Sequence, residues 1–194
     1  MWDRRYNVPM FRRLFLVLVI ATTASAQTTH KPLFPLPTAI EELKASSAVA
    51  ADVRSAIEAE LAKSSCKPSG AEKYEVAEID LRHEGQATVV RVEEPCLCGA
   101  SDNCPIFVVE RSKVVLPDGS GFGFAMNLPA KGDSAELVIA SHTSPNVTAL
   151  QRYRWKGGRF KLRDCEAAVR KDDAKAKWNP EEMEIAGCDA IALK

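Results

Sequence analysis

The sequence has no apolar run long enough to cross a lipid bilayer as a helix. Its longest run, residues 14–21 (LFLVLVIA), is less than half of the roughly 20 residues that a transmembrane helix needs. We therefore expect no transmembrane segment in the mature chain. The sequence also lacks an internal repeat, a G-x-S-x-G nucleophile elbow and a G-x-G-x-x-G phosphate loop, so the usual signals of repeat proteins, serine hydrolases and dinucleotide-binding domains are missing.

An excess of basic side chains is absent as well. The full chain has 26 Lys and Arg and 26 Asp and Glu. Residues 1–26 hold four arginines and one aspartate, so the remaining chain carries 22 basic and 25 acidic side chains. A dedicated nucleic-acid binder would show the opposite balance, and we expect no nucleic-acid partner.

The first 26 residues have the three parts of a secretory signal peptide. Arg12 and Arg13 form a basic region, residues 14–21 form the apolar region, and residues 24–26 (ASA) provide small side chains for cleavage before Gln27. We expect a protein that is exported to the periplasm or secreted.

The rest of the chain predicts one disulfide-bonded α+β domain at 38–194, after an extended, proline-containing leader at 27–37. Thr38 and Glu41 fit a capping box at the start of a helix. Apolar residues then recur at helical spacing, which predicts an N-terminal helical region ending near Ser64. This apolar stripe consists of Ile40, Leu43, Val49, Val53, Ile57 and Leu61.

From Tyr74 onward apolar residues alternate with polar ones, which predicts an antiparallel β meander. Gly157 and Gly158 predict the turn of its last hairpin. Residues 118–123 (DGSGFG) predict a flexible hairpin turn, and a short C-terminal helix is expected at 166–178. The predicted strands cover about 74–81, 87–92, 105–110, 113–116, 122–128, 136–141, 150–155 and 159–163.

Six cysteines in an exported chain favour three disulfides, although six cysteines allow fifteen connectivities. Cys98 with Cys104 would close a small ring of turn-forming residues. Cys165 with Cys188 would flank the C-terminal helix, which leaves Cys66 with Cys96 as the third pair of this preferred connectivity.

Two other interpretations of the cysteine cluster at 96–104 stay open. Its three thiols could bind a metal ion together with His83 or His142, but no C-x-x-C or H-x3-H spacing supports this. A redox site would need a C-x-x-C motif ahead of a helix. We expect neither a metal nor another cofactor.

Two polar segments contain residue types that occur in functional sites. Residues 80–85 (DLRHEG) weakly resemble a calcium loop, but Arg82 and His83 stand where oxygen ligands are needed, so a solvated turn is favoured. Residues 141–144 (SHTS) place hydroxyls beside His142. Without a supporting motif, a polar loop after a strand is the simpler interpretation.

Basic side chains concentrate late in the chain, where residues 151–177 have ten Lys and Arg against four acids. A surface formed by these bases would bind an anionic partner, such as an envelope polysaccharide, a phospholipid surface or an acidic exported protein. The alternative is a solvated face that balances the acidic segment 72–94. Alternation along the predicted hairpin would gather five bases on its exposed side: Arg152, Arg154, Arg159, Lys161 and Arg163.

Three segments of the chain combine into a familiar pattern: residues 79–91 with a glycine turn, the ring 98–104 (CGASDNC), and the hairpin 153–160 (YRWKGGRF). The pattern resembles a loose group of exported bacterial proteins without an assigned function. The resemblance covers about residues 74–165. It implies a periplasmic or secreted, disulfide-bonded α+β domain and no particular activity or ligand.

Together these observations favour an exported, non-enzymatic domain that binds an envelope component or another exported protein. The alternatives are an envelope-directed hydrolase that uses His142 or His83, and a structural envelope protein without a discrete ligand.

Overall fold

The structure is a computed structural model of the 194-residue chain. It describes residues 37, 39–41, 43–46, 49–66, 69–70, 72–81, 85–99, 101–127, 135–170 and 183–187. The predicted signal peptide and nearly all of the predicted leader lie outside these ranges. No helix within them is long and apolar enough to cross a membrane.

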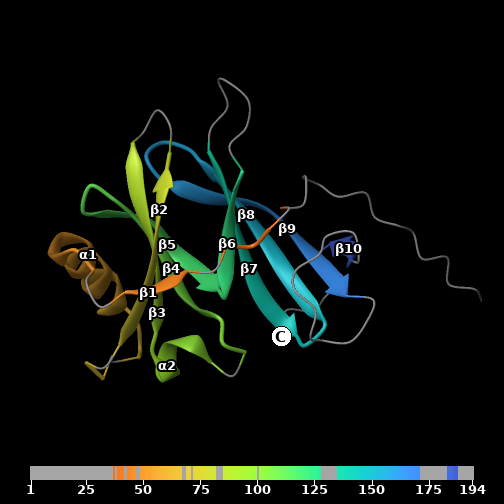
Figure 1. The fold of residues 1–194 in the computed structure, drawn as a ribbon, viewed down its shortest axis with the longest axis horizontal. Coiled ribbons are helices and arrows are strands. Elements are labelled where there is room, and N and C mark those ends of the chain that lie inside the picture. The colour runs from red at the N-terminus through yellow and green to blue at the C-terminus, as the bar shows by residue number, and fades with distance from the viewer. Residues whose placement is uncertain are drawn as a thin grey trace, which may run out of the picture.

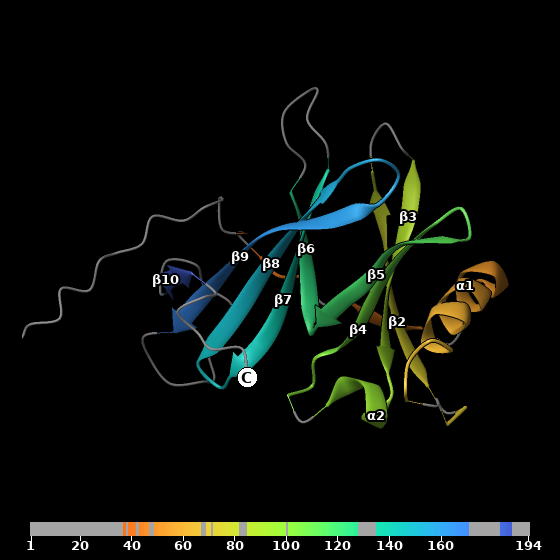
Figure 2. The same ribbon diagram turned by 180° about the vertical axis from the view of Figure 1, so that it is seen from behind.

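Two five-stranded antiparallel sheets make up the described fold, as Figures 1 and 2 show. Each sheet is a meander in which the strand order follows the chain, so the predicted antiparallel meander is confirmed. The first sheet contains β1 (Lys44–Ser46), β2 (Lys73–Asp80), β3 (Gln86–Glu93), β4 (Cys104–Glu110) and β5 (Lys113–Gly121). The second contains β6 (Gly123–Asn127), β7 (Glu136–Ser144), β8 (Val147–Trp155), β9 (Phe160–Arg170) and β10 (Met183–Gly187).

The largest apolar cluster draws on both sheets. Val89 and Ile106 of the first sheet and Phe124, Leu137 and Ile139 of the second are fully buried in it. This shared core joins the two meanders into one folded unit, because neither sheet alone could bury these side chains on both sides.

Helix α1 (Ala51–Leu61) covers the other face of the first sheet, as Figure 1 shows. Val53, Ile57 and Leu61 follow one another at intervals of four residues and therefore lie on one side of the helix. They pack against a cluster that includes Val90 and Phe107. The central strands β3 and β4 are thus covered on both faces, which explains why buried apolar residues follow one another directly in each, as Val89 and Val90 do in β3 and Val108 and Val109 in β4.

The predicted N-terminal helical region is correct only from Ala51 onward. Residues 44–46 form β1 and pair with β2, and Glu41 forms a β-bridge with Phe124. Leu43 belongs to the cluster between the sheets and Ile40 packs against a third cluster. The residues of α1 belong to another cluster, so the apparent helical stripe is divided among three apolar clusters. Residues 44–46 form backbone hydrogen bonds with the edge of β2 in place of the hydrogen bonds of a helix. Thr38 lies outside the described residues.

The predicted C-terminal helix is wrong for residues 166–170, which continue β9. This segment pairs with β8 along one edge and with β10 along the other, so its backbone groups are satisfied on both sides. Pairing of this kind outweighs the weak helical preference of the local sequence. Residues 171–178 of the predicted helix lie outside the described residues.

The glycine-rich segment 118–123 is not a hairpin turn. It carries the chain from β5 in the first sheet to β6 in the second, where the two sheets approach closely. A Cβ atom added at Gly119 would lie 2.5 Å from the Ile106 carbonyl oxygen, and one at Gly121 would overlap the Ala140 carbonyl oxygen. Glycine is needed here for space between the sheets rather than for flexibility.

Candidate functional site

The predicted basic surface lies on the β8–β9 hairpin. The two strands pair antiparallel, and Gly157 and Gly158 connect them with φ angles of 64° and 76°, as the turn prediction requires. The backbone N–H of Lys156 donates to the carbonyl oxygen of Arg159 at 2.9 Å and closes the turn. At its base, the rings of Trp155 and Phe160 meet edge to face with centroids 5.2 Å apart.

Two of the five predicted binding residues, Arg152 and Arg154, are neutralised by carboxylates of the same fold. Arg152 is only 9% exposed and forms ion pairs with Glu136 and Asp164. Arg154 also pairs with Glu136, with its Nε donating to Oε1 at 2.9 Å. Glu136 is itself buried, and a buried carboxylate without a partner would be strongly destabilising. The two arginines compensate its charge. The expectation that Arg152 lies on the exposed side is therefore wrong.

A shift in the register between β8 and β9 explains why Arg152 meets the carboxylate of Asp164. Tyr153 lies opposite Leu162, whereas Arg152 lies opposite Asp164, so Arg163 has no residue opposite it. This is the two-against-one count of a β-bulge. Arg163 therefore departs from the alternation that the sequence predicts, and its Nε lies 3.4 Å from Oδ2 of Asp164.

The remaining bases gather at the end of the hairpin. Residues 156–163 (KGGRFKLR) contain four bases and no acid, and we call this segment the basic tip. Lys156, Arg159 and Lys161 are exposed and form no ion pair with any residue that the structure describes. Beside them, Leu162 is 56% exposed and is the one large exposed hydrophobic side chain within the described ranges.

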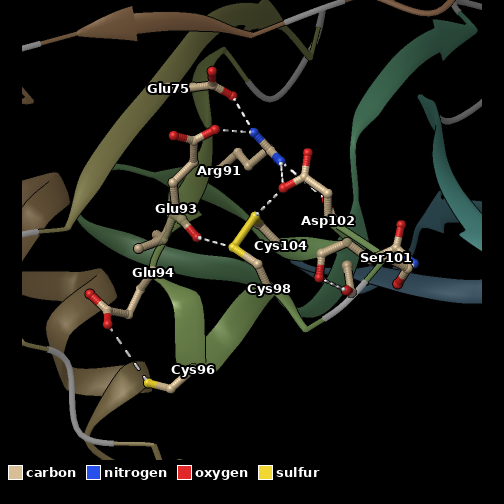
Figure 3. The surroundings of a disulfide bond; sticks show 12 residues. Glu75, Arg91, Glu93, Glu94, Cys96, Cys98, Ser101, Asp102 and Cys104 are labelled. Carbon is tan, nitrogen blue, oxygen red and sulfur yellow. Dashed lines mark hydrogen bonds and ion pairs between the residues drawn. A yellow bond between two sulfur atoms is a disulfide. The ribbon is translucent and has the colours of Figure 1, made fainter.

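A second candidate site surrounds the cysteine cluster, shown in Figure 3. Disulfides join Cys66 with Cys96 and Cys98 with Cys104, which confirms two of the three preferred pairs. Cys165 is disulfide-bonded as well, and its predicted partner Cys188 lies outside the described residues.

The metal interpretation of this cluster is wrong. Three possible ligand atoms lie within 4.8 Å of one another, one each from Cys98, Asp102 and Cys104. Both of the sulfur atoms, however, belong to the same disulfide. Neither can therefore act as a thiolate ligand. His83, one of the two proposed additional ligands, lies outside the described residues.

Arg91 organises the carboxylates beside the Cys98–Cys104 disulfide, as Figure 3 shows. Its Nη1 lies 2.8 Å from Glu75 and 2.7 Å from Glu93, its Nη2 lies 3.1 Å from Asp102, and its Nε donates to the Gly121 carbonyl oxygen at 3.3 Å. Burial acts to lower the pKa of Arg91, but hydrogen bonds to Glu75 and Glu93 and the charges of Glu75 and Asp102 outweigh burial and raise that pKa. Arg91 is only 4% exposed and thus has a structural role.

A pocket of about 660 Å³ opens next to this network. Its wall combines three acids, one base and the cysteine loop, and Ser69 donates to one of the acids, Glu94, at 2.9 Å. The strands β2 and β3 and the short helix α2 (Pro95–Cys98) bring these residues together, so spacing in the sequence gives no signal for the pocket. The polar and charged lining residues are Ser69, Lys73, Glu93, Glu94 and Asp102.

The segment 141–144, predicted as a polar loop, is the end of strand β7. The side chain of Asn103 binds the backbone of His142 on both sides: the His142 N–H donates to Oδ1 at 2.8 Å, and Nδ2 donates to the His142 carbonyl oxygen at 2.6 Å. The cysteine ring of the first sheet is thereby attached to the second sheet. The His142 ring stacks on Phe122 with centroids 4.0 Å apart. The hydrolase function of His142 or His83 stays a prediction.

Comparison with protein-family models, curated proteins and solved structures returned no match. The resemblance to exported proteins with a C-G-x-x-x-N-C ring therefore stays a prediction. The function has to be argued from the chemistry of the two candidate sites alone.

Proposed function

We propose that this protein is an exported, non-enzymatic binding domain of the periplasm or the extracellular space, and that it binds an anionic envelope component through the basic tip. The signal-peptide pattern at 1–26 supports export. The two disulfides are consistent with an oxidising compartment, because cytosolic proteins rarely keep such bonds.

The observation that carries the proposal is the contrast between two groups of bases on one hairpin. The charges of Arg152 and Arg154 are compensated by Glu136 and Asp164, so an external anion would have to displace these carboxylates. In the basic tip, by contrast, three of the four bases, Lys156, Arg159 and Lys161, form no ion pair with any described residue. Uncompensated charge of one sign on a protruding turn attracts the opposite charge, even though the exported chain has a net negative charge.

The structure of the turn also favours binding. The backbone hydrogen bond between Lys156 and Arg159 and the packing of Trp155 on Phe160 hold the turn in place. A turn that is ordered before it meets its partner loses little conformational entropy on binding.

Salt elution from an anionic matrix tests this proposal. The exported chain with intact disulfides is loaded on immobilised heparin, alongside a variant with Lys156→Glu, Arg159→Glu and Lys161→Glu. The matched control changes the exposed residues Lys44, Lys63 and Lys113 to Glu, which gives the same net charge on other parts of the surface.

We expect the wild-type and control proteins to be retained, and the tip variant to elute at a much lower salt concentration. Equal elution of the tip variant and the control would refute a specific role of the basic tip. Circular dichroism spectra check that all three proteins are folded.

A further inference from the structure

The exposure of Leu162 is unusual for its place in the fold. Its cross-strand neighbour Tyr153 is 5% exposed, and Trp155 and Phe160 on the same hairpin are 7% and 3% exposed, whereas Leu162 is 56% exposed. Three of these four side chains belong to the core between the sheets, and Leu162 projects beyond its edge.

The charged residues of the basic tip that precede and follow this leucine in the sequence are all positive. Lys161 and Arg163 flank it directly, and Arg159 and Lys156 follow along the basic tip. The first acid after the segment is Asp164, which pairs with Arg152 and Arg163. An exposed apolar side chain thus has an exposed base on each side of it along the strand.

We infer that the anionic partner is the surface of a phospholipid bilayer, into which Leu162 inserts while the surrounding bases bind lipid phosphates. This inference rests on the proposed function and names its ligand. A bilayer interface offers both components that the tip presents, namely an apolar layer and, directly above it, a layer of anionic headgroups. Long basic side chains reach from the apolar boundary to the phosphates. A soluble polyanion offers charge without an apolar layer and leaves Leu162 exposed.

The expected contributions follow from the composition of the tip. Each Lys or Arg near an anionic bilayer strengthens binding about fivefold, so the three bases without an ion pair, Lys156, Arg159 and Lys161, give about two orders of magnitude. Leu162 still has about half of its side-chain surface to bury, which corresponds to a further gain of roughly fivefold. The result is reversible peripheral binding that depends on the lipid charge.

Vesicle sedimentation tests the inference with the full exported, oxidised chain. The vesicles are pure phosphatidylcholine or an equimolar mixture of phosphatidylcholine and phosphatidylglycerol, and immobilised heparin represents a polyanion without an apolar layer. The variants are Leu162→Ser, Leu162→Ile as the conservative control, and the charge-reversed tip variant described above. Leu162 is exposed, so its replacement leaves the core intact.

We expect binding to mixed vesicles about 100-fold or more above binding to pure phosphatidylcholine. Leu162→Ser should weaken vesicle binding about fivefold without changing heparin retention, and Leu162→Ile should bind as the wild type does. Retention on heparin with no binding to mixed vesicles, or with vesicle binding that is equal for the Ser and Ile variants, would overturn the bilayer inference and leave the proposed function intact. Failure to bind either material would overturn both.

Discussion

Replacement of Gly121 with alanine should strongly destabilise the fold, because the added methyl group has no space. An ideal Cβ atom at this position overlaps the carbonyl oxygen of Ala140 and lies 2.8 Å from Cγ2 of Ile139. The same carbonyl oxygen accepts a hydrogen bond of 2.9 Å from the backbone N–H of Phe122. The variant has to move β5 away from β7 and weaken this hydrogen bond.

These two effects set the size of the loss. Overpacking of a close-packed site costs about 1–3 kcal/mol, and the loss of one backbone hydrogen bond costs about 1 kcal/mol. We therefore expect the free energy of unfolding to fall by about 3 kcal/mol. For a domain of this size, that corresponds to a decrease in Tm of roughly 6–12 °C.

Urea unfolding, followed by tryptophan fluorescence with the disulfides intact, measures this loss. Ser120→Ala is the matched control, because Ser120 is exposed and loses only the hydrogen bond of 3.1 Å from its Oγ to the Asn103 carbonyl oxygen. We expect that control to lose less than about 1 kcal/mol. Unfolding of Gly121→Ala at the same urea concentration as the control would refute the close approach of the two sheets.

Two further predictions concern buried polar groups. Arg91→Met leaves three carboxylates without their shared cation and should lower the free energy of unfolding by about 2–3 kcal/mol, less than for a fully buried ion pair because these carboxylates keep contact with solvent. The control Lys63→Ala breaks an exposed ion pair of 2.7 Å and should cost less than about 0.5 kcal/mol. Equal urea midpoints of the two variants would contradict this difference. Burial raises the pKa of Tyr153 to about 12 from 10.0, so its neutral phenol favours the folded state fully below about pH 10, and this contribution is lost as the pH rises toward 12. Tyr153→Phe should show a decline in stability over this range that is smaller by about 2 kcal/mol, and an identical decline in both proteins would show that the ring is accessible to solvent.

Most of the strands were predictable because they leave a local signal, whereas β1, β10 and the second half of β9 do not. Alternating apolar residues locate β2, short apolar runs locate β3, β4 and β7, and the pair Gly157-Gly158 locates the last hairpin with the positive φ angles that it needs. The Cys98–Cys104 disulfide was predictable for a similar reason, since the five turn-forming residues 99–103 bring its ends together. Each of these features is decided within a short segment of the chain.

The helices and the glycine segment were harder to predict because their neighbours decide them. Residues 44–46 and 166–170 have helical character in isolation, but both lie beside strand edges that offer backbone hydrogen bonds. Residues 118–123 have the composition of a turn, but they cross from one sheet to the other at a place where only a glycine fits between the neighbouring backbones. No local pattern distinguishes a glycine that bends the chain from one that makes room for another strand.

The sequence by itself determined the antiparallel meander, two disulfide pairs and the basic hairpin. Only the tertiary structure decided which of the hairpin's bases are available to a partner. Glu136, which compensates Arg152 and Arg154, lies on another strand, and the bulge at Arg163 shifts the register by one residue. Periodicity describes one strand at a time, whereas the net charge of a surface depends on which strands become neighbours and in which register. For that reason the sequence predicts a face of five available bases, whereas the structure has a basic tip that includes one exposed leucine.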